Sequence, residues 1–195
     1  MLYAKIKSEF DTVVDKCQVT LITDAAEAAK FRDEVAMPRY NQRDDRLASM
    51  TDESQKEGFK PEKHRVAYLE WYDAPAPEVD NNACMILISG GGYNNCCDVG
   101  LIEKWSKELT ALGFQCVNFV YRTPRPEGLP IYQTAWEDAQ RAVRMVRAEA
   151  KKRGYDPEKI GVCAMSAGSH LGLLLATNSQ TAAYQPIDAL DTVPC

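Results

Sequence analysis

The strongest candidate for a chemically active residue in this chain is the serine at the centre of residues 164–168, whose sequence is AMSAG. An apolar run of strand length, 160–165, leads into it, and a leucine-rich stretch of helical length follows. A serine on such a strand-to-helix turn exposes its hydroxyl, and the turn requires small residues two positions before and after it, here Ala164 and Gly168. The segment therefore predicts Ser166 as a nucleophile, with alanine in place of the first glycine of G-x-S-x-G. An ordinary strand–loop–helix joint would also accept these small residues.

Backbone N–H groups beside this serine supply the second part of the predicted chemistry. The first N–H groups of a helix have no partner within it and lie at its positive end. Ala167 N–H is therefore placed to stabilise an oxyanion that forms beside Ser166. A triple glycine, 90–92, follows another apolar run and lets the backbone approach a ligand oxygen closely. We predict that the N–H groups of Gly91 and Gly92 complete an oxyanion hole; the alternative is a flexible loop.

Strands and helices alternate around these two motifs. Alternating or continuously apolar runs predict strands, and apolar residues at steps of three and four predict helices. This order predicts an α/β fold with a doubly wound, mostly parallel sheet and helices on both faces. Right-handed crossovers then bring the glycine loop and the serine turn to the same edge of the sheet. The predicted strands are 64–72, 83–88, 114–121 and 160–165, and the predicted helices are 102–112, 136–150 and the stretch after the serine turn.

Side-chain patterns within these elements predict which faces are buried. The stretch 171–176 is expected to be a buried helix, and three cysteines lie in predicted buried strands, where a free thiol behaves as a small hydrophobe. The helix 136–150 has an apolar inner face and a basic stripe that we expect on its solvated face. Gly113 and Gly154 are natural helix stops. The cysteines are Cys84, Cys116 and Cys163, and the stripe consists of Arg141, Arg144, Arg147 and Lys151.

The composition is that of a soluble globular protein and disfavours several partner classes. The chain has 195 residues, of which 45% are hydrophobic, and a net charge of −5. An acidic chain is a poor ligand for nucleic acid, and no apolar run approaches the roughly 20 residues of a membrane span. Seven cysteines in no zinc-binding pattern predict no metal site and favour a reducing, cytoplasmic compartment. We divide the chain into an N-terminal extension of unclear role, 1–62, and a domain part, 63–195.

The motifs in combination resemble the α/β-hydrolase fold, specifically the esterases with a His-Gly-Gly-Gly loop, and among them the acetyl xylan esterase-like carbohydrate esterases. The resemblance covers residues 64–195 and implies a serine carboxylesterase without a cofactor. In it Ser166 forms an acyl-enzyme, and the three N–H groups named above supply the oxyanion hole. The implied substrate is a small acyl ester, such as acetyl groups on a plant polysaccharide. Ser89 stands where the family has histidine. The segments that carry the resemblance are 89–93, 120–122, 138–142, 156–160 and 164–171.

The acid and the base of a catalytic triad are not present in the expected positions. In this fold they follow the serine in the order Asp or Glu, then His, yet only 29 residues follow Ser166. His170 lies on the helix after the serine and His64 opens an earlier strand, so both are interpreted as structural. Asp188 and Asp191 come too soon after that helix. We therefore expect the N-terminal part of a longer esterase, truncated after the nucleophile helix and inactive or nearly so by itself.

The same patterns leave other functions and a surface property to consider. Truncation would leave the strand 160–165 as an apolar open edge, which is prone to self-association. A peptidase on the same fold stays open, and so does a non-catalytic binding or assembly subunit, because a base is lacking. A nucleotide-binding module would need G-x-G-x-x-G and an acidic residue after the next strand. Asn95 and Arg122 stand at those positions and disfavour this last function.

Overall fold

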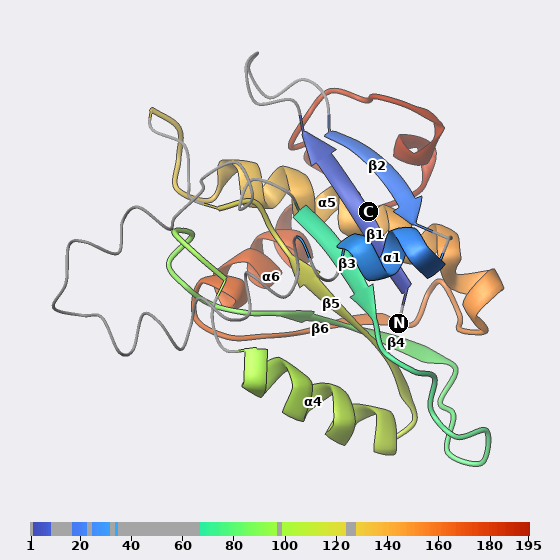
Figure 1. Cartoon of the computed structure of the whole chain (residues 1–195). Coiled ribbons are helices and arrows are strands. Elements are labelled where there is room, and N and C mark those ends of the chain that lie inside the picture. Colours follow the sequence, from blue (N-terminus) through green and yellow to red (C-terminus); the bar gives the residue numbers. More distant parts are fainter. Residues whose placement is uncertain are drawn as a thin grey trace, which may run out of the picture.

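A single mixed sheet with helices on both faces forms the frame of the molecule (Figure 1). The computed structural model describes residues 2–8, 17–22, 25–31, 34, 67–96, 99–123 and 128–195. Among these residues the strand order is β2-β1-β3-β5-β4-β6. The strands are β1 (Leu2–Ser8), β2 (Cys17–Ile22), β3 (Ala67–Trp71), β4 (Ala83–Ile88), β5 (Phe114–Val120) and β6 (Ile160–Ala164).

Parallel pairing is confined to the part of the sheet that carries the two motifs. β4 lies between β5 and β6 and is parallel to both, whereas β3 pairs antiparallel with β5 and with β1, and β1 pairs antiparallel with β2. The predicted α/β class, with a mostly parallel arrangement of the strands from β3 to β6, is confirmed. The first strand was not predicted, and its pairing with β3 joins residues of the N-terminal segment to the sheet.

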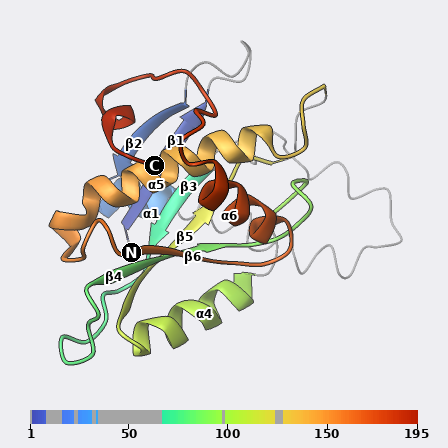
Figure 2. The same ribbon diagram turned by 180° about the vertical axis from the view of Figure 1, so that it is seen from behind.

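Helices cover the sheet from both sides, as Figures 1 and 2 show from opposite directions. Helix α4 (Val99–Ala111) contacts β4 and β5 on one face. Helix α1 (Ala25–Phe31) lies on this same face, where Phe31 makes an edge contact with Tyr68 of β3. Helices α5 (Gln133–Arg153) and α6 (Ala167–Asn178) cover the opposite face, and a short helix η3 (Ala189–Thr192) packs against α5.

The main hydrophobic core lies between the sheet and α5, where the predicted periodicities meet. Every second side chain of the central strands points to this side, and each large apolar side chain buried there contributes about 1.5–3 kcal/mol. The predicted inner face of α5 is confirmed, and the helix ends at Gly154 with φ 83°. The buried residues of this core include Leu69, Trp71, Ile86, Ile88, Val117, Phe119, Ala139, Val143, Val146 and Ala150.

The open edge predicted for the serine strand is present among the described residues. β6 is the last strand of the sheet and pairs with β4 alone, and Val162 is 40% exposed. For the same reason Cys163 is half-buried rather than buried. The prediction of a buried helix after Ser166 was half wrong: the side of α6 that faces the core is buried, but Leu173 is 65% exposed, because no described element packs on its outer face.

The prediction that the basic stripe of α5 faces solvent is confirmed for Lys151, which is exposed, but is wrong for Arg141, while Arg144 and Arg147 are half-buried. Arg141 is fully buried and pairs with Asp188 at 2.5 Å and with Asp191 at 2.7 Å. The C-terminal segment folds back along α5, so this arginine meets its partners there; Arg144 likewise donates to Val193 O at 3.1 Å. The hydrogen bond from the guanidinium lowers the pKa of Asp188. For Asp191 burial would raise the pKa, but donated hydrogen bonds, first that of Tyr184, outweigh burial and lower it.

Candidate active site

Ser166 occupies the turn between β6 and α6 in the arrangement that its sequence predicts. Its backbone has φ 51° and ψ −122°, a conformation that costs a non-glycine residue about 1–3 kcal/mol and persists only where the surroundings impose it. Helix α6 begins at the next residue, Ala167, and the Ser166 carbonyl accepts a hydrogen bond from His170 N–H at 3.2 Å. Ser166 is exposed. The strained turn thus presents an accessible hydroxyl.

Two glycines let the serine turn pack against the end of β4. A Cβ atom on Gly168 would lie 2.5 Å from the carbonyl oxygens of Ile88 and Ser89, so no side chain fits there. A Cβ atom on Gly90 would lie 2.8 Å from Ser166 Cβ. Because β4 and β6 are parallel neighbours, the loops that follow them leave the same edge of the sheet. The glycine loop and the serine turn are therefore in direct contact.

Three backbone N–H groups near this contact have no acceptor among the residues that the structure describes. Gly91 and Gly92 have φ values of 124° and 61°, and a Cβ atom on Gly91 would lie only 2.0 Å from Asn95 O. Within the described ranges, the N–H groups of Gly91, Gly92 and Ala167 donate to no other residue. Unpaired N–H groups are the donors that an oxyanion requires. Their assignment as an oxyanion hole stays a prediction, to which this geometry adds support.

Two tyrosines to which the sequence analysis gave no role lie beside the start of α6, next to the serine turn. The hydroxyl of Tyr93 lies 3.0 Å from Ala167 O and 2.8 Å from Nδ1 of His170. The imidazole also makes an edge contact with the ring of Tyr132, at 5.6 Å between centroids. Burial raises the pKa of Tyr93 to about 12, so its hydroxyl keeps its proton at neutral pH. The one signal in the sequence was the position of Tyr93 directly after the glycine triplet.

A third tyrosine anchors the glycine loop from the core side. The buried Tyr121 donates its hydroxyl to the carbonyl oxygens of Ser89 and Gly90, at 3.4 Å and 3.3 Å. In a planar trans peptide the N–H group points away from the carbonyl group. Since these carbonyls face Tyr121, the N–H groups that follow them in the chain, those of Gly90 and Gly91, face away from it.

No general base accompanies the serine in the described part of the chain. There, Ser166 Oγ has no hydrogen-bond partner. The side chain of His170 is engaged by the tyrosines described above, in keeping with its structural interpretation, and Asp188 and Asp191 pair with an arginine of α5. His64 lies outside the described residues. Among the described residues, no cluster of three or more His, Cys, Asp or Glu is arranged to hold a metal ion.

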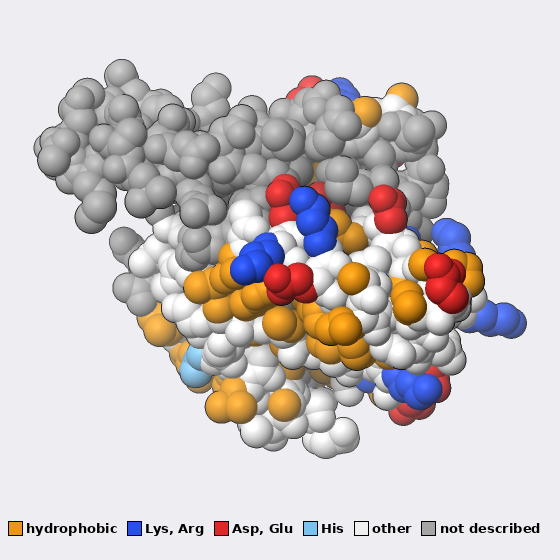
Figure 3. All heavy atoms as spheres, turned by 90° about the horizontal axis from the view of Figure 1, so that it is seen from below, with side chains coloured by type: hydrophobic (Ala, Val, Ile, Leu, Met, Phe, Trp, Pro, Cys, Tyr) orange, Lys and Arg blue, Asp and Glu red, His pale blue; other side chains and the backbone are white. Residues whose placement is uncertain are grey.

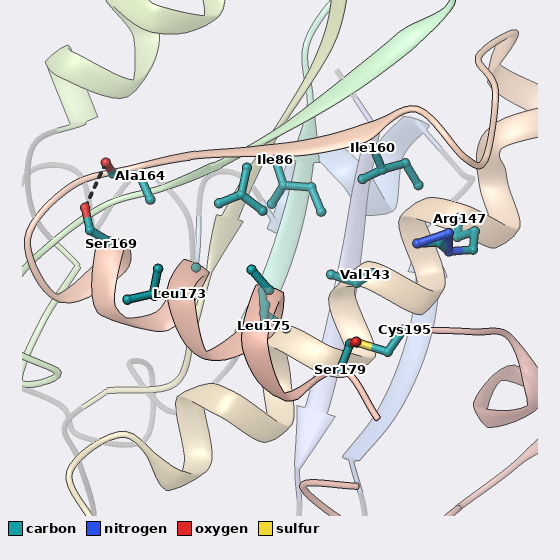
Figure 4. Close-up of a pocket in the computed structure, with 13 residues that line it drawn as sticks. Ile86, Val143, Arg147, Ile160, Ala164, Ser169, Leu173, Leu175, Ser179 and Cys195 are labelled. Atoms are coloured by element: carbon teal, nitrogen blue, oxygen red, sulfur yellow. Dashed lines mark hydrogen bonds between the residues drawn. The ribbon is translucent and has the colours of Figure 1, made fainter. Parts of the chain in front are cut away.

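An apolar groove of about 570 Å³ lies beside the serine turn without including Ser166 (Figure 4). It is bounded by β6, α6 and α5, and Cys195 lies at one end of it. Ala164 and Ser169 belong to its lining and are joined by a hydrogen bond of 3.0 Å from the Ser169 hydroxyl. The groove thus follows the open edge of the sheet, whereas Ser166 lies at the turn, outside its lining. None of the described helices is long and apolar enough to cross a membrane.

Comparison with models of protein families shows to which family the chain belongs. The model of the BD-FAE family matches residues 70–192, more than half of the chain. The chain belongs to the BD-FAE family. The match begins in β3 and extends through the glycine loop, the serine turn and η3. Membership of the BD-FAE family confirms the resemblance to α/β-hydrolase esterases that the motifs indicate.

Individual relatives of this BD-FAE chain include carbohydrate-active hydrolases. Endo-1,4-beta-xylanase B of Butyrivibrio fibrisolvens is 33% identical over 92 residues, which cover 45% of the chain and 14% of the relative. The acetyl ester-xyloside bifunctional hydrolase of Caldicellulosiruptor lactoaceticus has a similar structure, with a TM-score of 0.53 and 27% identity; the alignment covers 74% of the chain and 51% of that protein. A shorter stretch of 54 residues, 28% of the chain, is 46% identical to 7% of the carbon monoxide dehydrogenase/acetyl-CoA synthase subunit alpha of Moorella thermoacetica. The chain therefore spans about half the length of the solved relative and less of the others.

Proposed function

We propose that Ser166 is the nucleophile of a serine carboxylesterase that hydrolyses acyl esters through an acyl-enzyme. The observation that carries the proposal is the strained backbone of Ser166 beside N–H groups that have no acceptor in the described part of the chain. Backbone strain of this kind gathers at functional sites, where the surroundings hold it for the sake of geometry. Membership of the BD-FAE family supports ester hydrolysis as the reaction.

In the proposed reaction, Ser166 Oγ attacks the carbonyl carbon of the ester and gives its proton to a base. The carbonyl oxygen becomes an oxyanion, which accepts hydrogen bonds from the N–H groups of Gly91, Gly92 and Ala167. One such donor is worth about 10²–10³ in kcat. The tetrahedral intermediate then releases the alcohol, which takes up the proton, and leaves an acyl group on Ser166. Water attacks this acyl-enzyme in the same way and releases the carboxylic acid.

The substrate class that we propose is a small acyl ester on a carbohydrate, such as an acetyl group on a plant polysaccharide. The support comes from the relatives, one of which is named an acetyl ester-xyloside hydrolase and another a xylanase. The described site adds that the hydroxyl of Ser166 is exposed rather than enclosed. An exposed nucleophile suits an ester carried on a large alcohol.

We further propose that the base and the acid come from outside these 195 residues. A serine without a base is a weak nucleophile at neutral pH. An oxyanion hole and substrate binding alone retain a rate of about 10³–10⁴ over water when triad members are removed. The 195-residue chain alone is therefore expected to turn over esters close to this residual level.

Hydrolysis of p-nitrophenyl acetate tests the proposed function. The assay compares the 195-residue chain with a longer product of the same reading frame, each with the variants Ser166→Ala and Ser179→Ala. We expect efficient turnover by the longer product, abolished by Ser166→Ala and kept by Ser179→Ala, whose hydroxyl lies at the far end of α6. Turnover by the longer product that survives Ser166→Ala would sink the proposal. Efficient turnover by the 195-residue chain would refute only the expectation that this chain is nearly inactive, and not the role of Ser166.

A non-catalytic binding or assembly subunit is the second candidate function. The missing partner of Ser166 Oγ among the described residues favours it. The same assay separates the two functions, because a binding subunit gives no Ser166-dependent turnover in either form.

We propose that the isolated chain associates with a second copy of itself through the open edge of β6. The strand has an unpaired edge, and apolar side chains gather in patches between the charged ones on the face shown in Figure 3. Exposed strand edges are templates for pairing with another copy.

A further inference from the structure

Tyr93 is held in an unusual position that the proposed reaction leaves unexplained. The residue follows the glycine triplet and has φ 63°, which is uncommon for a residue with a Cβ atom. Its side chain is 3% exposed, and its ring packs at a tilt against Tyr121, with 5.6 Å between centroids. Loop residues seldom combine a left-handed backbone with a buried aromatic ring. The surroundings of the hydroxyl group give a reason.

The contacts of this hydroxyl admit one arrangement of protons that satisfies all of them. A carbonyl oxygen only accepts, so the single proton of the Tyr93 hydroxyl goes to Ala167 O, 3.0 Å away. The hydroxyl oxygen then accepts from His170, whose Nδ1 atom is 2.8 Å away. In this arrangement Nδ1 of the neutral imidazole carries the proton and Nε2 carries none. The tautomer is set by the hydrogen bond that the ring makes.

We propose that Tyr93 and His170 form a latch that fixes the glycine loop against the start of α6. The latch joins the two elements that meet at Ser166: Tyr93 belongs to the loop, and Ala167 and His170 belong to the helix. On the far side of the loop, Tyr121 holds two of its carbonyl groups. Clamped from both sides, the loop keeps its N–H groups in a fixed place relative to the serine.

Both residues are positioning residues in this proposal. Neither side chain is hydrogen-bonded to Ser166 Oγ, so His170 does not act as its base. The latch itself follows from the described contacts, whereas its effect on the rate of serine acylation rests on the proposed function. A small displacement of an oxyanion donor lowers the rate strongly, because the donors must lie 2.7–3.1 Å from the place of the oxyanion.

Nitrogen-15 NMR of the imidazole rings tests the latch without any activity. The chain has two histidines, His64 and His170, and the variant His64→Gln leaves the signal of His170 alone. At a pH where the imidazole is neutral, we expect His170 to carry its proton on Nδ1. In Tyr93→Phe it should revert to the Nε2–H form that histidine favours in water. A wild-type ring with its proton on Nε2, or a tautomer unchanged in Tyr93→Phe, would overturn the latch.

Hydrogen exchange and serine labelling test the positioning role, with Tyr155→Phe as the matched control. Tyr155 is also buried and donates its hydroxyl to Val146 O at 2.6 Å, away from the serine turn. We expect Tyr93→Phe, unlike the control, to speed amide exchange at Asn94 and Asn95, which donate to Gly91 O. It should also slow labelling of Ser166 by a fluorophosphonate about tenfold or more, a part of the 10²–10³ lost with a whole donor.

The two proposals fail in distinguishable ways. Equal exchange and equal labelling in Tyr93→Phe and Tyr155→Phe would overturn the positioning role while Ser166 remains a nucleophile. Absence of labelling in the wild-type protein would overturn the proposed function, and the tautomer and the exchange rates would still decide the latch.

Discussion

The substitution Gly168→Ala is expected to displace the serine turn. The added Cβ atom would lie 2.5 Å from two backbone carbonyl oxygens at the end of β4, whereas an ordinary contact begins at 3.4 Å, so α6 must move by about 0.9 Å. Overpacking of this kind costs about 1–3 kcal/mol. The helical preference for alanine over glycine returns up to about 1 kcal/mol.

Gly172→Ala provides the matched control in the same helix. Its added Cβ atom would meet the side-chain atom Val162 Cγ1 at 3.1 Å, on an exposed strand edge that can give way. We expect Gly172→Ala to leave the unfolding temperature nearly unchanged. Gly168→Ala should lower it by about 2–4 °C for each kcal/mol lost.

Calorimetry and serine labelling read the two effects of this substitution. We expect Gly168→Ala to lose both stability and the rate of fluorophosphonate labelling at Ser166, because the helix that it displaces carries Ala167 N–H. The close approach of α6 to β4 would not position the serine if Gly168→Ala had the same unfolding temperature and the same labelling rate as Gly172→Ala.

Two further predictions concern the C-terminal segment and the sheet edge. The pKa values of Asp188 and Asp191 are lowered in the folded chain, where both carboxylates pair with Arg141. These ion pairs therefore stabilise the folded chain at pH values above the unfolded carboxyl pKa of about 3.9. The stabilisation is lost as the pH falls through the lower pKa values of the folded chain. Asp191→Asn should therefore melt lower at pH 7 and lose less stability than wild type between pH 5 and pH 2, as circular dichroism would show; parallel curves would contradict it. Val162→Lys should reduce self-association in light scattering while changing the unfolding free energy by less than about 0.5 kcal/mol, since Val162 is 40% exposed at the β6 edge; association that is unaffected by the charge would place the contact elsewhere.

Local patterns predicted the two motifs and the strands that carry them. The serine turn needs small residues at fixed positions, and Gly168 occupies the place where a Cβ atom would collide with backbone oxygens. The glycine triplet likewise follows a continuously apolar strand, which is typical of a strand covered on both faces. These constraints act between residues that are close in sequence, so a single sequence reveals them.

Contacts between distant segments explain what the sequence reasoning missed. Arg141 sits on the polar side of its helix by periodicity, and it is buried because Asp188 and Asp191, far along the chain, cover it. Nothing in the residue type of Tyr93 indicates a special contact. Its hydrogen bond with His170 forms only where the glycine loop meets α6 in the folded chain. The outer face of α6 is as apolar as its inner face, so leucines alone do not tell which face is buried.

Intact-mass analysis after fluorophosphonate treatment tests most directly whether Ser166 is a nucleophile. The probe would be applied to the 195-residue chain, to a longer product of the same reading frame, and to Ser166→Ala in each. We expect one adduct, on Ser166, formed rapidly in the longer product and slowly or not at all in the short chain, and none in the Ser166→Ala proteins. No adduct on Ser166 in either form would contradict the esterase proposal and leave the strained serine as architecture alone.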